Sequence, residues 1–214
     1  MGSLMGLILW IIFLFGLMAV FKHFLPLIKG KLGENYVNQR LQQNFAAPYV
    51  IIDNITLPDG QGSTTQIDHI LLSPFAIFVI ETKNYQGWIF ASERQKQWTQ
   101  TIYQRKHRFQ NPLHQNYKHI KVLQNIFADL IEADHFQGFV VFTGTAEFKT
   151  KIPKHVFVDE DWIEFIQSFQ STRISDETMQ KLEQRLATMS LEKSWQTNRE
   201  HVKNLKQRTK PPAV

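Results

Sequence analysis

The segment from Gln66 to Asn84, QIDHILLSPFAIFVIETKN, constrains the fold more than any other part of the sequence. It consists of two apolar runs of strand length, separated by a Ser-Pro pair. Short apolar runs that meet at turn residues are typical of two adjacent buried strands. However, Asp68, Glu81 and Lys83 stand inside these runs, where burying a charge without a partner is costly. The segment therefore predicts a hairpin whose charged residues are paired or functional.

The register of this hairpin decides where its charges lie. A chain reversal at the Ser-Pro pair sets Leu72 opposite Phe75. Counting outward from that pair sets Asp68 opposite Val79, and Glu81 becomes the diagonal neighbour of Asp68 at a backbone separation of roughly 7 to 8 Å. Because side chains alternate between the two faces of a strand, a slip of one residue would separate the two carboxylates.

Two carboxylates at this spacing can converge on one divalent cation. Their oxygens suit Mg²⁺ or Mn²⁺, which are hard ions that keep several waters and accept phosphate oxygens. Lys83 lies one strand step beyond Glu81, where an ammonium can orient or help to deprotonate a metal-bound water and offset charge on a phosphoryl oxygen. The alternative is that these residues only end the strands and form a surface ion pair. Taken alone, an Asp followed some thirteen residues later by Glu-x-Lys is a weak indication of a catalytic site. The position of these groups inside apolar strands favours a hydrolytic site for a phosphodiester.

The N-terminal region predicts a membrane anchor. Residues 4–21 form a run of 18 residues without a charge, and as a helix this run is roughly 27 Å long, close to the thickness of a bilayer core. We expect a transmembrane helix over residues 4–28. A cleaved signal peptide is the alternative, but the run lacks a basic leader and a small-x-small cleavage pattern. Basic residues follow the run, and they predict a cytoplasmic location for the rest of the chain: Lys22, Lys29, Lys31 and Arg40.

The composition excludes several kinds of site. The chain has no cysteine, so disulfides, thiolate metal ligands and a cysteine nucleophile are excluded. Its formal net charge of +5 is compatible with a polyanionic partner, either nucleic acid or an anionic lipid surface.

The remaining pattern predicts a mixed sheet between helices, and hence an α/β (α+β) fold. A juncture at residues 30–33 precedes a helix with Val37, Leu41 and Phe45 at spacings of four, and Glu34 stands in its first turn, where a helix-dipole charge is the structural interpretation. A second amphipathic helix begins after Asn111 as its cap. Further strands are expected at residues 49–55, 87–90, 97–102 and 136–142.

Several other residues have structural interpretations. His69 faces away from Asp68 by strand alternation. Three further histidines, His107, His114 and His119, have no metal-ligand spacing on a shared helical face; His114 and His119 are five residues apart, which is a poor fit. Trp88 and Trp98 can stack on bases, although packing beneath the sheet is the favoured interpretation. The C-terminal extension, residues 146–214, is expected to hold helices and a basic tail at residues 190–210, which is either solvated or in contact with phosphates or anionic lipid.

Several motifs, taken in order, resemble a known family. GENYVNQRL, the central QIDHILLSPFAIFVIETKN, GWI, Trp98 and NPLHQN resemble the nuclease-related domain, NERD, a branch of the PD-(D/E)XK restriction-endonuclease-like nucleases. The resemblance places this domain at residues 33–145. It departs from the literal PD element, because Ile67 precedes Asp68, a position that is loose in the wider superfamily.

The resemblance implies a restriction-endonuclease-like core and metal-dependent cleavage of nucleic acid, with DNA as the expected substrate. It implies that Asp68 and Glu81 bind the metal and that Lys83 is the catalytic lysine. It also implies that Glu34 supports the metal or its water and that Gln115 points toward the active centre.

The sequence therefore predicts a membrane-anchored, Mg²⁺-dependent nuclease with a cytoplasmic domain. A nucleic-acid-binding or regulatory module that has lost cleavage is the second hypothesis, and a domain that recruits protein partners is the third. Because phosphate contacts do not read base identity, DNA and RNA both remain open as substrates.

Overall fold

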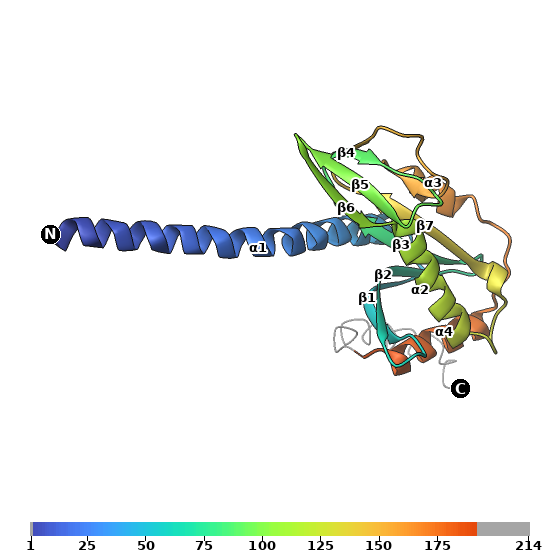
Figure 1. The fold of residues 1–214 in the computed structure, drawn as a ribbon. Coiled ribbons are helices and arrows are strands. Elements are labelled where there is room, and N and C mark those ends of the chain that lie inside the picture. Colours follow the sequence, from blue (N-terminus) through green and yellow to red (C-terminus); the bar gives the residue numbers. More distant parts are fainter. Residues whose placement is uncertain (1, 192–214) are drawn as a thin grey trace.

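The computed structural model describes residues 2–191 of the chain, so most of the predicted basic tail lies outside the described residues. Figure 1 shows a long N-terminal helix that leads into two sheets with flanking helices. The elements, in chain order, are α1 (Gly2–Asn44), β1 (Val50–Pro58), β2 (Thr64–Leu72), β3 (Ile77–Lys83), β4 (Gly87–Phe90), β5 (Gln97–Ile102), β6 (Arg105–Gln110), α2 (Pro112–Ile126), the 3₁₀ helix η1 (Ala133–His135), β7 (Phe136–Phe142), β8 (Ala146–Phe148), β9 (Val156–Phe157), α3 (Asp161–Gln167) and α4 (Asp176–Met189).

The described strands form two mixed sheets. The larger sheet has the order β1-β2-β3-β7-β9, in which β1, β2 and β3 are antiparallel neighbours and β3, β7 and β9 run parallel. The smaller sheet has the order β6-β5-β4-β8. Parallel neighbours need a long crossover connection, and β3 reaches β7 through the smaller sheet and α2. The predicted mixed α/β architecture is therefore confirmed.

The two faces of the larger sheet bury separate apolar clusters. On one face, Ile70 of β2 and Val79 of β3 pack with residues of α2 and α4. On the other face, Leu71 and Ile80 pack with residues of α1 and α3. The segment after residue 145 thus contributes to both sheets through β8 and β9 and to both faces of the larger sheet through α3 and α4.

The hairpin of β2 and β3 has a different register from the predicted one. Leu72 lies opposite Ile77 and not Phe75, so the prediction was wrong by two residues. The turn is longer because Ser73 closes it: its Oγ donates to the carbonyl of Ala76 at 2.7 Å and accepts from the amide of Ala76 at 3.1 Å. A shift of two residues leaves every side chain on its original face. Asp68 therefore still shares a face with Glu81.

Helix α1 is continuous from Gly2 to Asn44, so the predicted juncture at residues 30–33 is wrong. Isolated glycines cost only about 1 kcal/mol each within a helix, and the hydrogen-bond ladder continues through them. Gly33 instead marks the closest approach of α1 to the sheet. A Cβ at this position would lie 2.8 Å from Cβ of Asn84 and 2.8 Å from Oγ1 of Thr143. This contact places Glu34 beside the ends of β3 and β7.

The segment for which the sequence predicts a transmembrane helix, residues 4–28, forms the N-terminal part of α1 and extends away from the sheets (Figure 1). Most large apolar side chains that the structure describes between Met5 and Ile28 are exposed. In the part of the chain that is described, no helix is both long enough and apolar enough to cross a membrane.

The smaller sheet contains two strands that the sequence did not predict. The strands at residues 87–90 and 97–102 are confirmed as β4 and β5, whereas β6 and β8 were missed. The sequence of β6, RKHRFQ, has no apolar alternation, because its first four residues are exposed on an edge strand. Pairing with β5, rather than burial, makes this segment a strand.

Candidate active site

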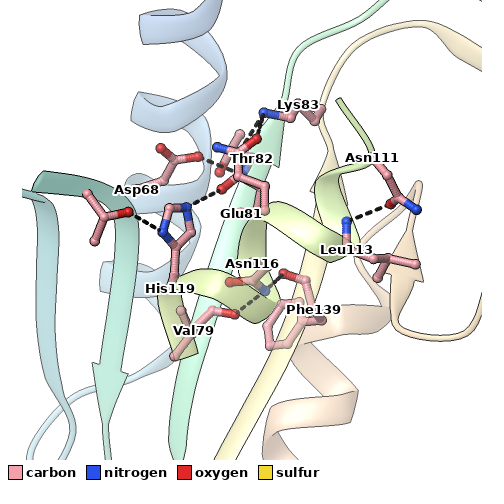
Figure 2. A network of polar contacts seen from close by, with 12 residues as sticks. Asp68, Val79, Glu81, Thr82, Lys83, Asn111, Leu113, Asn116, His119 and Phe139 are labelled. Atoms are coloured by element: carbon pink, nitrogen blue, oxygen red, sulfur yellow. Dashed lines mark hydrogen bonds and ion pairs between the residues drawn. The ribbon is translucent and has the colours of Figure 1, made fainter. Parts of the chain in front are cut away.

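A cluster of charged and polar side chains lies where β3 ends, between β2 and α2 (Figure 2). β2 contributes Asp68, and β3 contributes Glu81 and Lys83. The apolar residues that precede Glu81 build the buried length of β3, so its carboxylate is carried into the interior and is only 1% exposed. Helix α2 contributes Gln115 and His119 from the face that covers β3. The structure thus brings Glu81, Lys83 and Gln115 into direct contact.

Both carboxylate oxygens of Glu81 have partners. Oε1 accepts a hydrogen bond from Lys83 Nζ at 2.5 Å, and Oε2 lies 3.2 Å from Nε2 of His119. The other ring nitrogen of His119, Nδ1, lies 2.8 Å from the hydroxyl of Thr65. If Nε2 donates to Glu81, Nδ1 accepts from Thr65, and this chain of contacts fixes the tautomer and the orientation of the ring. Thr65, His119 and Glu81 are all buried.

Lys83 is held as an ammonium ion. Its Nζ contacts Gln115 Oε1 at 3.3 Å in addition to Glu81. Burial lowers the pKa of Lys83, but the charge and hydrogen bond of Glu81 and the charge of Asp68 outweigh this effect, so the pKa is raised. Lys83 is therefore a source of positive charge and of hydrogen-bond donors at neutral pH, and not a free base.

Asp68 has the strongest upward pKa shift in the cluster. Burial and then the negative charge of Glu81 raise its pKa to about 7, and the charge of Glu34 acts in the same direction. The backbone amide of Thr82, which donates to Oδ2 at 2.8 Å, and the charge of Lys83 only partly oppose these effects. The cluster thus holds more negative charge than its cations balance. A carboxyl group in this condition is typical of functional sites.

Glu34 approaches the same region from α1. It pairs with Lys31 at 3.4 Å and lines a small polar pocket together with Asp68. His69 also lines this pocket. Its side chain points to the face of the sheet opposite to that of Asp68, as predicted, and this face is the one that α1 covers. Burial lowers the pKa of His69 to about 4, so its ring is neutral at pH 7.

The donor set can be compared with the needs of a divalent cation. Within residues 2–191, no group of three or more His, Asp or Glu side chains is gathered closely enough to hold a metal ion. Mg²⁺, however, is commonly held by one or two carboxylates, with water and phosphate oxygens as its remaining ligands. Asp68 and Glu81 supply two carboxylates. Burial and then the charge of Glu81 raise the pKa of Asp68, and a bound cation would oppose both effects by favouring its ionised form. These residues therefore fit an oxygen-ligated divalent ion.

Sequence reasoning missed His119 and Thr65. His119 was compared only with His114, five residues away, whereas its spacing from Gln115 is four, which places both on one face of α2. That spacing was a usable signal. No sequence signal connects Thr65 with His119, because the contact joins a strand to a helix 54 residues away. Of the two tryptophans, Trp98 is fully buried, whereas Trp88 is 49% exposed.

Comparisons with known proteins identify the family of the chain. The family model of the nuclease-related domain, NERD, matches residues 29–143, a range that contains every residue of the cluster. An uncharacterized protein of Bacillus anthracis, pXO1-01, is 35% identical over 165 residues, which is 77% of this chain and 78% of that protein. No solved structure matches the chain. The family match spans more than half of the sequence, and the chain belongs to the nuclease-related domain family.

Proposed function

We propose that this protein is a metal-dependent nuclease that hydrolyses phosphodiester bonds of nucleic acid, with DNA as the expected substrate. Membership of the nuclease-related domain family indicates a nuclease-related function. The observation that carries the proposal is the carboxyl of Asp68, whose pKa is raised to about 7 beside the buried Glu81–Lys83 pair. Burying such a group is costly, and binding of a cation and a phosphate would explain why the fold places a carboxyl group there.

Each residue then has a role. Asp68 and Glu81 would hold Mg²⁺ or Mn²⁺, which supplies Lewis acidity and a more acidic bound water when present. The Lys83 ammonium offsets the negative charge that develops on a phosphoryl oxygen. Gln115 positions Lys83 through its 3.3 Å contact, and Glu34 adds a further carboxylate beside Asp68.

His119 and Thr65 act as positioning residues. They hold Oε2 of Glu81, so they determine how its carboxylate faces Asp68. Partners of this kind around metal-binding carboxylates typically change metal affinity or activity by about 10- to 100-fold when removed. We expect His119→Ala to raise the Mg²⁺ concentration for half-maximal cleavage by a factor in that range. Thermal unfolding of the same variant checks that the fold is retained, and an unchanged Mg²⁺ dependence in a folded variant would refute the positioning role.

The alternative is a non-catalytic module at the membrane, which uses the nuclease fold to bind nucleic acid or to serve a regulatory role. One observation favours it: both oxygens of Glu81 already have protein partners, as in a purely structural cluster. Cleavage assays separate the two functions.

The decisive experiment uses the full-length chain in a mild detergent. Linear duplex DNA, single-stranded DNA and RNA are incubated with Mg²⁺, Mn²⁺ or EDTA. We expect metal-dependent cleavage that Asp68→Ala and Lys83→Ala each reduce by about 100-fold or more. A matched control is the pair of Asp59 and the exposed Lys118, whose charged atoms are 4.0 Å apart and which lies outside the cluster. Alanine at either control position should leave the rate unchanged.

Two results would change the conclusion. If the wild-type chain cleaves none of the substrates but still binds DNA, the non-catalytic module is correct. If Asp68→Ala and Lys83→Ala cleave as well as wild type, the active site lies elsewhere in the chain.

We also propose that α1 anchors the protein to a membrane, with the folded domain on the cytoplasmic side. No described helix meets the requirements for crossing a membrane, so the proposal rests on the exposed apolar side chains that the structure describes between Met5 and Ile28. Exposed apolar area of this extent is typical of a membrane or protein contact. The full-length chain should float with phospholipid vesicles in a density gradient, and recovery only in the unbound fraction would contradict the anchor.

A further inference from the structure

The edge strand β6 is unusually basic. Arg105, Lys106, His107 and Arg108 follow one another along the strand, and all four are exposed. Because side chains alternate, Arg105 and His107 face one side of the smaller sheet, and Lys106 and Arg108 face the other. β6 is paired only with β5 and forms one edge of the sheet, so its cations surround a free edge.

These cations are not neutralised by the rest of the described chain. Arg105, Lys106 and Arg108 form no ion pair with any residue between 2 and 191, and neither β5 nor β6 contains an acidic residue. Some cations elsewhere in the domain do have acidic partners. Arg185, for example, pairs with Asp129. β6 therefore offers a local positive charge that is available to an external anion.

Aromatic side chains lie on one face of the same sheet. The strand pairing sets Lys106 opposite Thr101 and Thr101 opposite Trp88. In the same way, Arg108 is linked through Thr99 to Phe90. Trp88 is 49% exposed and Phe90 is 39% exposed, so two rows run from a cation on β6 to an exposed aromatic ring on β4. The ammonium of Lys149 lies 4.9 Å from the centre of the Trp88 ring, but it is paired with Glu147, which lies opposite Trp88 on β8, so Lys106 and Arg108 are the unpaired cations of this face among the described residues.

The smaller sheet is held in a fixed position relative to the candidate active site. β4 begins four residues after Lys83. The Asn111 side chain, which caps α2, also donates to the carbonyls of Ser92, Glu93 and Gln95 in the β4–β5 connection. Since α2 carries Gln115 and His119, Asn111 couples the position of the smaller sheet to that of the site.

We propose that β6 and the adjoining face of the smaller sheet form a contact surface for the phosphate backbone of nucleic acid. The inference rests on the proposed function, because it concerns how that substrate is held. Lys106 and Arg108, which share the face that carries the aromatic rings, are two residues and hence about 6.8 Å apart along the strand, which corresponds to about two phosphate steps along one strand of DNA. A row of unpaired cations beside exposed aromatic rings matches a polyanion whose bases can stack. An anionic membrane is the competing partner. Exposed aromatic rings lie on β4, beside Lys106 and Arg108, and also at the β5–β6 turn, where Tyr103 is 96% exposed, so binding to anionic vesicles is measured beside binding to the duplex.

The test measures binding without cleavage. The full-length chain in a non-ionic detergent is titrated against a labelled short duplex in EDTA, and the anisotropy is followed at several salt concentrations. One variant combines Arg105→Gln, Lys106→Gln and Arg108→Gln. Its matched control combines Lys118→Gln, Lys121→Gln and Lys181→Gln, which removes the same charge from exposed positions on α2 and α4.

The expected result is a change in salt dependence. Each lost phosphate contact reduces the slope of log affinity against log salt by about 0.9, so the β6 variant should lose about 2.7 from the slope. The ratio of the wild-type affinity to the variant affinity for the duplex should therefore fall about 40-fold between roughly 50 and 200 mM salt. The control variant should keep a slope close to that of wild type. Lys106→Gln and Arg108→Gln as single variants, each with a change of about 0.9, provide the same test if the triple variant does not fold.

Three outcomes would overturn the inference. These are an unchanged slope in the β6 variants, an equal loss in the control variant, and a loss of binding to anionic vesicles with duplex binding intact. A parallel cleavage assay with Mg²⁺ separates this inference from the proposed function. Salt-dependent binding through β6 in a chain that does not cleave supports the surface and refutes the nuclease, whereas cleavage with an unchanged slope does the reverse.

Discussion

The titration of Asp68 provides a direct test of the environment of the candidate site. Burial and the charge of Glu81 raise the pKa of this carboxyl from its ordinary value of 3.8 to about 7. Asp68→Asn removes the ionisable group but keeps a side-chain oxygen that can accept the hydrogen bond from the Thr82 amide. A comparison of wild type and Asp68→Asn therefore isolates the effect of ionisation on the free energy of unfolding.

The sign and size of the effect follow from the pKa. The folded chain keeps the proton up to about pH 7, whereas the unfolded chain releases it near pH 3.8. The unfolded state therefore binds fewer protons between these values, and stability falls as the pH rises. The contribution is fully present below pH 3.8 and is lost as the pH passes through about 7. At about 1.4 kcal/mol per pH unit, wild type should lose about 2.5 kcal/mol relative to Asp68→Asn between about pH 5 and 8.

The measurement is chemical denaturation of both proteins across this pH range in EDTA. Asp59→Asn is the matched control. Backbone hydrogen bonds from Gln61 and Ser63 lower the pKa of Asp59, so its stabilising charge is lost only at more acidic pH. The difference between wild type and Asp59→Asn should therefore stay constant from about pH 5 to 8. If the difference for Asp68→Asn is also constant, the carboxyl is not in a desolvated, negatively charged environment.

Two further substitutions test how the domain is assembled. Gly33→Ala should destabilise the fold by about 1 to 3 kcal/mol, because a Cβ there would lie 2.8 Å from both Asn84 and Thr143. Gly30→Ala is the control in the same helix. Its Cβ would meet no atom within 4 Å, so this substitution should stabilise the fold by about 0.4 to 1 kcal/mol. Denaturation midpoints of the two variants measure both effects, and shifts of equal sign would contradict the close packing of α1. Asn111→Ala removes the hydrogen bond to the Leu113 amide and the contacts to the β4–β5 connection, and should cost about 1 to 3 kcal/mol in thermal unfolding. A cost near zero would mean that Asn111 does not join α2 to the smaller sheet.

The central hairpin shows how far local sequence carries a prediction. The two apolar runs and the Ser-Pro pair were sufficient to predict the strands and to place Asp68 and Glu81 on one face. The register was wrong by two residues because the hydrogen bonds of Ser73 set the turn length. The face was correct because side-chain direction repeats every two residues and tolerates an even shift.

The N-terminal helix and β6 show the opposite case. Gly30 and Gly33 suggested a break, but a helix can continue through a glycine, and Gly33 is needed for a close approach to β3 and β7. β6 has no periodic apolar residues, so only its pairing with β5 identifies it as a strand. Features that depend on contacts between residues far apart in the sequence cannot be predicted from the local pattern of apolar residues.

By itself, the sequence determined the mixed α/β architecture, the family, and the residues Asp68, Glu81 and Lys83 as the centre of interest. Apolar periodicity and alternation are local properties, so they can be read from neighbouring residues. The tertiary structure decided that His119 and Thr65 support Glu81, that Gln115 contacts Lys83, and that β6 lies at a free sheet edge. Those contacts join segments tens of residues apart, and their geometry is set by how α2 packs on β2 and β3 and by how β6 pairs with β5.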